Sequence, residues 1–117
     1  MDLRDLVRAI LAEDFLAARQ WVKDAYRARV RWDQIEKPNG LDEREMTVAA
    51  GVAELLASRA GVTPPSWTLA VGPVEEPLFL DPGLRGMPRT LAHAKTDGPE
   101  SFRKRNLIAS ADFLSVA

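Results

Sequence analysis

Two groups of basic side chains are the residues of this chain best suited to contact another molecule. The first group is spaced four residues apart, so on a continuous helix it would form one slowly drifting stripe. Its members are Arg19, Lys23, Arg27 and Arg31. Trp21, Tyr26 and Trp32 are interleaved with them. Such a stripe could follow a phosphate backbone. The other interpretation, which we favour, is the solvated outer face of an amphipathic helix.

The second basic group stands in the segment "PESFRKRNLIAS", which runs from Pro99 to Ser110. Consecutive positions of a helix diverge by about 100°, so three adjacent bases cannot all face one ligand. We expect Phe102 to point inward, and at least one arginine to pair with a carboxylate or to cap helix carbonyls. The main role of the segment would then be to anchor the fold, and contact with a partner would be a secondary role. The partner-binding candidates are Arg103, Lys104, Arg105, Asn106 and Trp67.

Catalytic chemistry would depend on His93, the single histidine. A histidine general base needs a nucleophile and an orienting carboxylate, but its neighbours Lys95, Thr96 and Asp97 would leave a helix in different directions. A small enzyme using His93 is therefore the weakest of three functions considered. A zinc site needs about four ligands, the chain has no cysteine, and no glycine-rich phosphate loop is present. We expect neither a metal nor a cofactor.

Length and charge restrict the class of protein. The 117 residues fit one domain. The formal net charge of −1 is unlike that of dedicated nucleic-acid binders, which are usually more basic. No apolar run approaches the roughly 20 residues that span a bilayer. The beginning of the chain mixes acids and bases within its apolar pattern, which is not typical of a signal peptide. We expect a cytoplasmic protein with no membrane association.

Residues 1–37 are expected to form a helical hairpin. The apolar positions in residues 2–13 recur at helical spacing, with Asp2 as a candidate N-cap. A second helix is expected over about 14–29, where Asp14 could cap a new start. Whether the two helices break there or continue as one is left open by the sequence. The apolar positions of the second helix are Leu16, Ala18, Trp21, Val22, Ala25 and Tyr26.

Residues 41–60 carry the clearest local signature of the chain. Asp42 and Glu45 have capping-box spacing, and Leu41 and Met46 occupy the positions of a hydrophobic staple. Gly61 stands where a C-terminal glycine belongs. Most of the helix surface is apolar, so we expect a buried central helix with a narrow polar strip. The strip consists of Glu43, Thr47, Glu54 and Ser58.

Residues 61–88 hold six of the eight prolines but also several large apolar side chains, which a disordered linker would lack. We expect an ordered Pro/Gly-rich wrap over the helices. Its "PLFL" stretch has no evident strand partner, so we expect a loop. In residues 88–117 we expect a helix near 88–96, a short turn or helix over 100–105, and a last helical turn over 111–116 capped by Ser110. The predicted fold is a single, mainly α domain of about five helices.

The stretches "AAGVAELLASRAGVTPPSWT", "PLFLDP" and "SFRKRNLIASADFLSVA" resemble small bacterial proteins of antitoxin-like or regulatory type. The shared elements are an E-L-L-A-x-R segment, a P-x-W-T element and a terminal F-x-x-R-N segment. Trp67, Phe102, Arg105 and Asn106 match the recurring positions, for which the resemblance implies no catalytic role. The resemblance covers about residues 45–117 and implies an antitoxin-like or regulatory member of a toxin–antitoxin gene pair.

The leading functional hypothesis is a non-catalytic protein-interaction module, of the antitoxin-like or regulatory type that the resemblance implies, that binds a protein partner or a second copy of itself. The alternative is a nucleic-acid-binding protein that uses the stripe from Arg19 to Arg31. No convincing helix-turn-helix pattern accompanies that stripe, so the sequence does not support a repressor.

Overall fold

The computed structural model describes residues 1–81 and 88–115, and in the helix that begins at Pro88 it leaves out the side chains of Pro88, Thr90, Leu91 and His93. Within this part of the chain the protein is mainly helical, as predicted. Its elements, with 3-10 helices labelled η, are α1 (Leu3–Leu11), α2 (Phe15–Arg27), η1 (Trp32–Gln34), α3 (Glu43–Arg59), η2 (Ser66–Ala70), β1 (Leu78–Phe79), α4 (Pro88–Asp97), α5 (Glu100–Arg103) and β2 (Leu107–Ile108).

Helices α1 and α2 are separate, which answers the question that the sequence left open. The side chain of Asp2 accepts from the amide of Arg4 at 2.9 Å, and that of Asp14 accepts from the amide of Ala17 at 3.1 Å. Between the helices, Glu13 adopts a left-handed φ of 60°. The expected inward position of Leu16 is wrong: its side chain is 82% exposed, because it lies opposite the buried face of α2.

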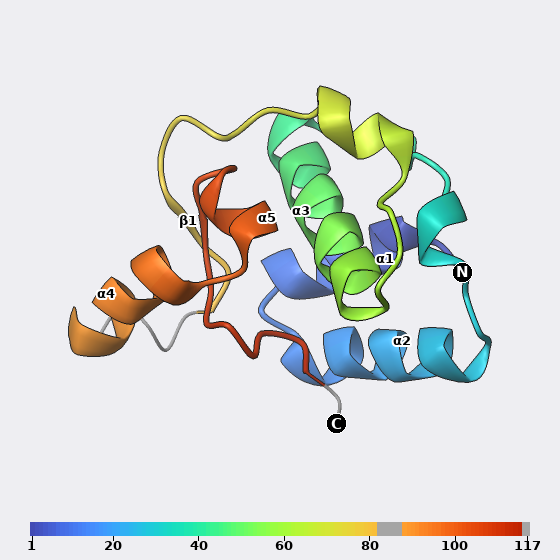
Figure 1. The fold of residues 1–117 in the computed structure, drawn as a ribbon, viewed down its shortest axis with the longest axis horizontal. Coiled ribbons are helices and arrows are strands. Elements are labelled where there is room, and N and C mark those ends of the chain that lie inside the picture. The colour runs from blue at the N-terminus through green and yellow to red at the C-terminus, as the bar shows by residue number, and fades with distance from the viewer. Residues whose placement is uncertain (82–87, 116–117) are drawn as a thin grey trace.

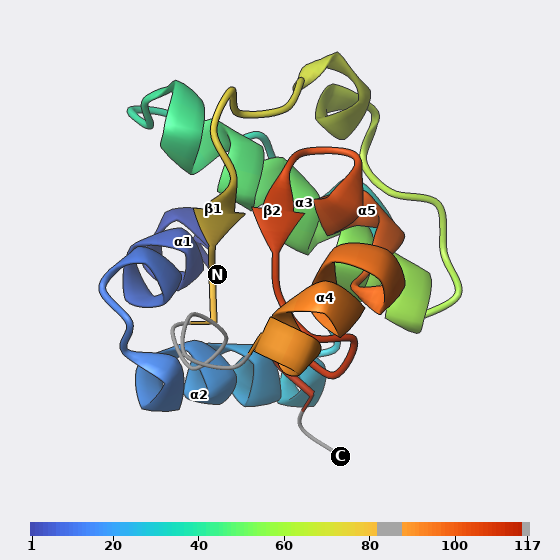
Figure 2. The same cartoon turned by 90° about the vertical axis from the view of Figure 1, so that its left-hand side faces the viewer.

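Helix α3 passes through the centre of the molecule and contacts α1, α5, η1 and η2 (Figures 1 and 2). Both hydrogen bonds of the predicted capping box are formed between Asp42 and Glu45. Every residue from Thr47 to Ala57 is buried, so the expectation of a buried helix is confirmed. At Gly51 the side chains of Phe102 and Leu107 come so close that an added Cβ would lie 2.9 Å from Leu107 Cδ1.

The "PLFL" stretch is not a loop, and this expectation was wrong. Leu78–Phe79 forms β1 and pairs in parallel with β2, with Leu78 opposite Leu107. The amide of Leu78 donates to the carbonyl of Asn106 at 3.0 Å, and that of Leu80 donates to the carbonyl of Ile108 at 3.0 Å. The partner strand lies far along the chain, which is why the local pattern did not reveal it.

The C-terminal part folds back onto α3 (Figure 2). Gly98 joins α4 to α5 where an added Cβ would lie 2.4 Å from the carbonyl oxygen of Ala94, so no larger residue fits. The expected last helix over 111–116 is wrong for the described residues, which form a turn at 111–114 with Leu114 at a left-handed φ of 59°. Residue 116 lies outside the described residues. Phe113 in this turn packs edge-on against Phe102, with ring centroids 5.7 Å apart.

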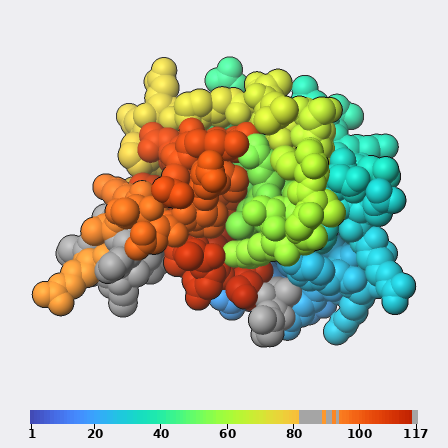
Figure 3. Space-filling view, viewed as in Figure 1, coloured from blue at the N-terminus to red at the C-terminus, as the bar shows by residue number. Residues whose placement is uncertain are grey.

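The wrap is ordered where the structure describes it, over residues 61–81, and lies on the molecule beside the C-terminal segment (Figure 3). Thr47 of α3 donates to the carbonyl of Gly72 at 3.2 Å, and the amide of Val74 donates to the carbonyl of Arg105 at 3.2 Å. Backbone and side-chain hydrogen bonds therefore hold the wrap to both α3 and the segment after α5. Among the described residues, no helix is both long enough and apolar enough to cross a membrane.

Candidate functional site

A buried carboxylate lies at the middle of α3. Glu54 belongs to the polar strip predicted for this helix, but its side chain is only 7% exposed because η2 and the segment after α5 cover it. A buried carboxylate is costly unless cations or hydrogen-bond donors compensate for its lost hydration. Glu54 therefore needs partners from other parts of the chain.

The main partner is Arg105, which follows α5 in a tight reversal of the chain. The amide of Arg105 donates to the carbonyl of Phe102 at 3.0 Å. Asn106 then takes a left-handed φ of 62°, a conformation that asparagine tolerates better than most residues. The reversal turns Phe102 and Arg105 toward α3, where Arg105 is only 3% exposed.

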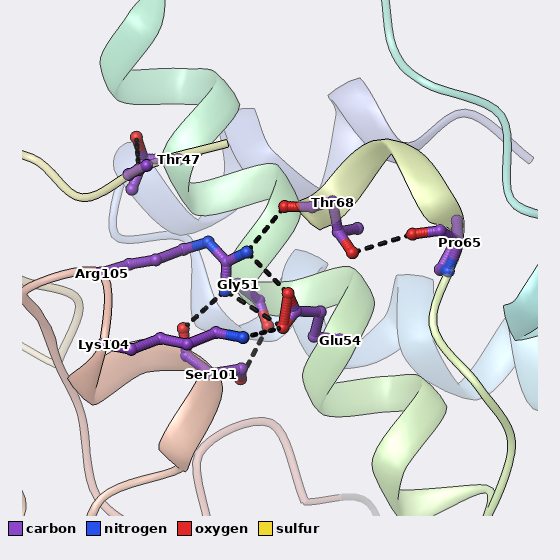
Figure 4. Close-up of polar contacts among 9 residues, drawn as sticks. Thr47, Gly51, Glu54, Pro65, Thr68, Ser101, Lys104 and Arg105 are labelled. Atoms are coloured by element: carbon purple, nitrogen blue, oxygen red, sulfur yellow. Dashed lines mark hydrogen bonds and ion pairs between the residues drawn. The ribbon is translucent and has the colours of Figure 1, made fainter. Parts of the chain in front are cut away.

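The guanidinium of Arg105 connects three segments that are far apart in the sequence (Figure 4). Its two terminal nitrogens bind both oxygens of the Glu54 carboxylate, at 2.6 and 3.1 Å. Nη2 also donates to the carbonyl of Thr68 in η2 at 2.8 Å, and Nη1 donates to the carbonyl of Ser101 in α5 at 3.1 Å. The expectation that at least one arginine of this segment pairs with a carboxylate or caps helix carbonyls is confirmed.

Lys104 adds a second cation to the same carboxylate. Its Nζ lies 2.8 Å from Oε2 of Glu54, and its side chain is 47% exposed (Figure 4). One buried negative charge thus faces two positive charges. We call Glu54, Lys104 and Arg105 the ionic cluster.

Two opposing effects act on the acidity of Glu54. Burial raises the pKa of this carboxyl, but the hydrogen bonds from Arg105 and Lys104, together with their charges, outweigh burial and hold the pKa below its ordinary value of 4.5. Glu54 is therefore ionised at neutral pH, as its two cationic partners require.

The ionic cluster fixes the position of η2. Thr68, whose carbonyl binds Arg105, is fully buried, and its hydroxyl donates to the carbonyl of Pro65 at 2.8 Å. On the other side of this turn, Nε1 of Trp67 donates to the carbonyl of Ile35 at 2.8 Å. Leu69, which follows the buried Thr68, points outward and is 76% exposed.

Two surface hollows meet at Lys104. The η2 hollow has a volume of about 150 Å³ and is lined by Leu69, Val71, Pro73, Lys104 and Arg105. The α5 hollow has a volume of about 370 Å³ and is lined by Glu54, Leu55, Ser58, Val62, Pro64, Pro99, Glu100, Ser101 and Lys104. Together they make a surface of mixed apolar and polar side chains around Lys104.

A larger hollow of about 630 Å³ lies beside α1 and η1, where no sequence pattern predicts a site. Its two arginines are already bound to carboxylates: Arg4 to Asp2 at 2.7 Å, and Arg31 to Asp33 at 3.2 Å. These guanidinium groups are thus used within the protein, so volume alone does not make this hollow the candidate site.

The predicted basic stripe is not continuous along one helix. Arg19, Lys23 and Arg27 are exposed on α2, but Arg31 lies beyond the end of the helix and precedes η1. The interleaved aromatic side chains pack on one another: the Trp32 ring lies 6.4 Å from that of Trp21 and 5.7 Å from that of Tyr26. Three cations therefore share a helix face, while the interleaved rings are engaged with one another and only Tyr26 among them is exposed, at 41%.

The partner-binding candidates from the sequence take different places. Arg103 is exposed and its Nε donates to the carbonyl of Gly98 at 2.8 Å. The Asn106 side chain donates to the carbonyls of Val74 and Glu75, which ties the wrap to the C-terminal segment. Arg105 and Trp67 use their polar groups within the fold. Of these candidates, Lys104 is the one that lines both hollows.

The catalytic candidate His93 lies in α4, and its side chain is outside the described residues. In the described part of the chain, no three histidine, aspartate or glutamate side chains gather where a metal ion could bind.

Sequence reasoning placed Glu54 on a polar strip but missed its burial and its ion pairs, and it also missed the exposure of Leu69. The signal for Glu54 was a single carboxylate in an otherwise apolar helical stretch, in a chain whose later segment carries three adjacent bases. For Leu69 no local signal existed, because an apolar residue in an ordered wrap is expected to face the core.

Scans of protein-family models, of curated proteins and of solved structures found no match to this chain. Its function is therefore inferred from the geometry around the ionic cluster.

The first prediction concerns the two cations of the cluster. Arg105→Met leaves Glu54 with Lys104 alone and removes the donors to Thr68 and Ser101, so it should lower the free energy of unfolding by about 3–5 kcal/mol. Lys104→Met removes a half-exposed partner and should cost about 1 kcal/mol or less. Urea unfolding measures both. Equal losses in the two variants would show that Arg105 has no special structural role.

The second prediction is a pH dependence. Because the pKa of Glu54 is lowered in the folded state, its stabilising contribution is complete above 4.5 and is lost as the pH falls through 4.5 toward the folded value. The difference in unfolding free energy between wild type and Glu54→Gln should therefore be largest at neutral pH and shrink in acid. A difference that stays constant from pH 7 to pH 3 would contradict the assigned ion pairs.

Proposed function

We propose that this chain is a non-catalytic protein-interaction module. Its contact surface, called the docking surface below, consists of Val62, Pro64, Leu69, Val71 and Lys104. The single observation that carries the proposal is the outward position of Leu69 on η2, a turn that hydrogen bonds from buried groups hold in place. An exposed leucine by itself is common on protein surfaces, so the fixed position of the turn is the informative part.

The turn is fixed by contacts that reach it from two directions. Arg105 binds the Thr68 carbonyl at 2.8 Å, and the Trp67 indole binds the Ile35 carbonyl at 2.8 Å. A side chain presented by an ordered turn loses little conformational freedom when a partner binds, and this favours affinity. Leu69 thus has the properties of a preorganised anchor.

The use of the charged groups supports a non-catalytic role. Both carboxylate oxygens of Glu54 are engaged by Arg105, and one of them also binds Lys104. A general acid or base needs a proton that it can exchange with a substrate, whereas this carboxylate is held ionised by two cations. The cluster is suited to positioning η2 and α5.

The resemblance of residues 45–117 to antitoxin-like proteins suggests which partner to examine first. An antitoxin-like module would bind a toxin protein and hold it inactive. The three elements that carry the resemblance include Trp67 and Arg105, which in this fold support the docking surface. The cytoplasm is the proposed compartment, and a chain without cysteine suits its reducing conditions.

Nucleic-acid binding through α2 remains the alternative. Arg19, Lys23 and Arg27 are exposed on one helix, with Arg27 3.9 Å from Asp24. Three phosphate contacts correspond to a log–log salt slope of only about −2.7 on duplex DNA. This surface is weaker support than the docking surface.

The third prediction uses photo-crosslinking in extracts of the source cells. A benzoylphenylalanine at position 69 should give a discrete protein adduct, because Leu69 is the most exposed apolar residue of the docking surface. The same group at position 16 is the matched control, since Leu16 is equally large and similarly exposed on α2. The adduct should resist nuclease and disappear when Val62→Asp is added to the position-69 variant.

Adducts at position 16 but not at position 69 would contradict the proposal. If those adducts were sensitive to nuclease, they would support the α2 alternative instead.

A further inference from the structure

We propose that the docking surface recognises an acidic segment of a partner protein, with a carboxylate in the η2 hollow beside Lys104 and an apolar side chain against Leu69. This inference rests on the proposed function and specifies the chemistry of the partner.

The charge of the ionic cluster is the first reason. Glu54 supplies one negative charge, and Lys104 and Arg105 supply two positive charges. Arg105 is buried against the carboxylate, so the surplus positive charge reaches the surface through Lys104, whose side chain is 47% exposed. A partner carboxylate would balance the cluster, because oppositely charged groups at an interface favour the correct partner and orientation.

The two hollows beside Lys104 differ in charge. Glu54 and Glu100 line the α5 hollow and offset the cations there. The η2 hollow is lined by Lys104, Arg105 and three apolar residues, with no acidic side chain among them. The carboxylate is therefore assigned to the η2 hollow, and the larger α5 hollow remains for apolar side chains of the same segment against Val62 and Pro64.

Arg105 gives an independent reason. Its terminal nitrogens make four hydrogen bonds. Its Nε, by contrast, is a buried donor without an acceptor among the described residues. Such a donor carries an uncompensated desolvation cost. Because Nε is buried, an incoming carboxylate meets Lys104 first, and the neighbouring charge of Arg105 then favours an anionic group over a neutral one.

Size limits the occupant. The η2 hollow has a volume of about 150 Å³. The part of the partner that enters it is therefore of the size of a single side chain, such as aspartate or glutamate. Leu69 and Val71 line the same hollow, so the residues that flank the carboxylate are expected to be apolar.

A random 12-residue peptide library displayed on phage tests the inference, with the full chain as bait. Selected peptides should carry aspartate or glutamate next to a large apolar residue, and Leu69→Asp should abolish their binding. In synthetic peptides, replacing the acid by its amide should weaken binding about fivefold or more. Lys104→Met should remove this preference for the acid, and Lys95→Met, at an exposed lysine of α4, should leave it intact.

The possible outcomes separate the two proposals. Peptides that bind through Leu69 but tolerate the amide equally well would overturn the acidic-segment inference and leave the interaction module standing. A library that yields no Leu69-dependent peptide would overturn both. Acidic peptides whose binding depends on Arg19 and Lys23 would place recognition on α2 and would also overturn the inference.

Discussion

The fold depends on one requirement: the carboxylate of Glu54, placed inside the molecule by the helix that forms its centre, must be neutralised there. Arg105 meets this requirement with a bidentate ion pair, whose two N–O distances are 2.6 and 3.1 Å. Buried ion pairs often stabilise proteins no better than apolar residues of similar size would. What this pair adds is position, because the same guanidinium also binds Thr68 and Ser101 and so fixes η2 and α5 on α3.

The proposed docking surface follows from two pairs of adjacent residues. Thr68 and Arg105 are buried and bind each other, while their neighbours Leu69 and Lys104 are exposed and line the same hollow. Each buried residue positions the exposed one beside it. An apolar anchor and a cation are thereby held on one face, although they are 35 residues apart in the sequence.

Sequence reasoning succeeded where the determining interaction is local. The N-caps at Asp2 and Asp14 and the capping box of Asp42 involve residues two or three positions apart, so their patterns are visible in the sequence. The pairing of β1 with β2 and the partner of Glu54 join residues about 29 and 51 positions apart, which no local pattern encodes. The exposure of Leu16 and Leu69 depends likewise on which faces the rest of the chain covers.

The most direct test of this account is amide hydrogen exchange in Arg105→Lys. A lysine keeps the charge beside Glu54 but cannot also span to the Thr68 carbonyl as the guanidinium does. The account predicts that the amides of Thr68 and Val71, which bond within and just after η2, exchange at least about tenfold faster in the variant, a change of about 1.4 kcal/mol, while Val22 in α2 changes little. Equal acceleration at all three amides, or none at any, would contradict the claim that Arg105 positions η2.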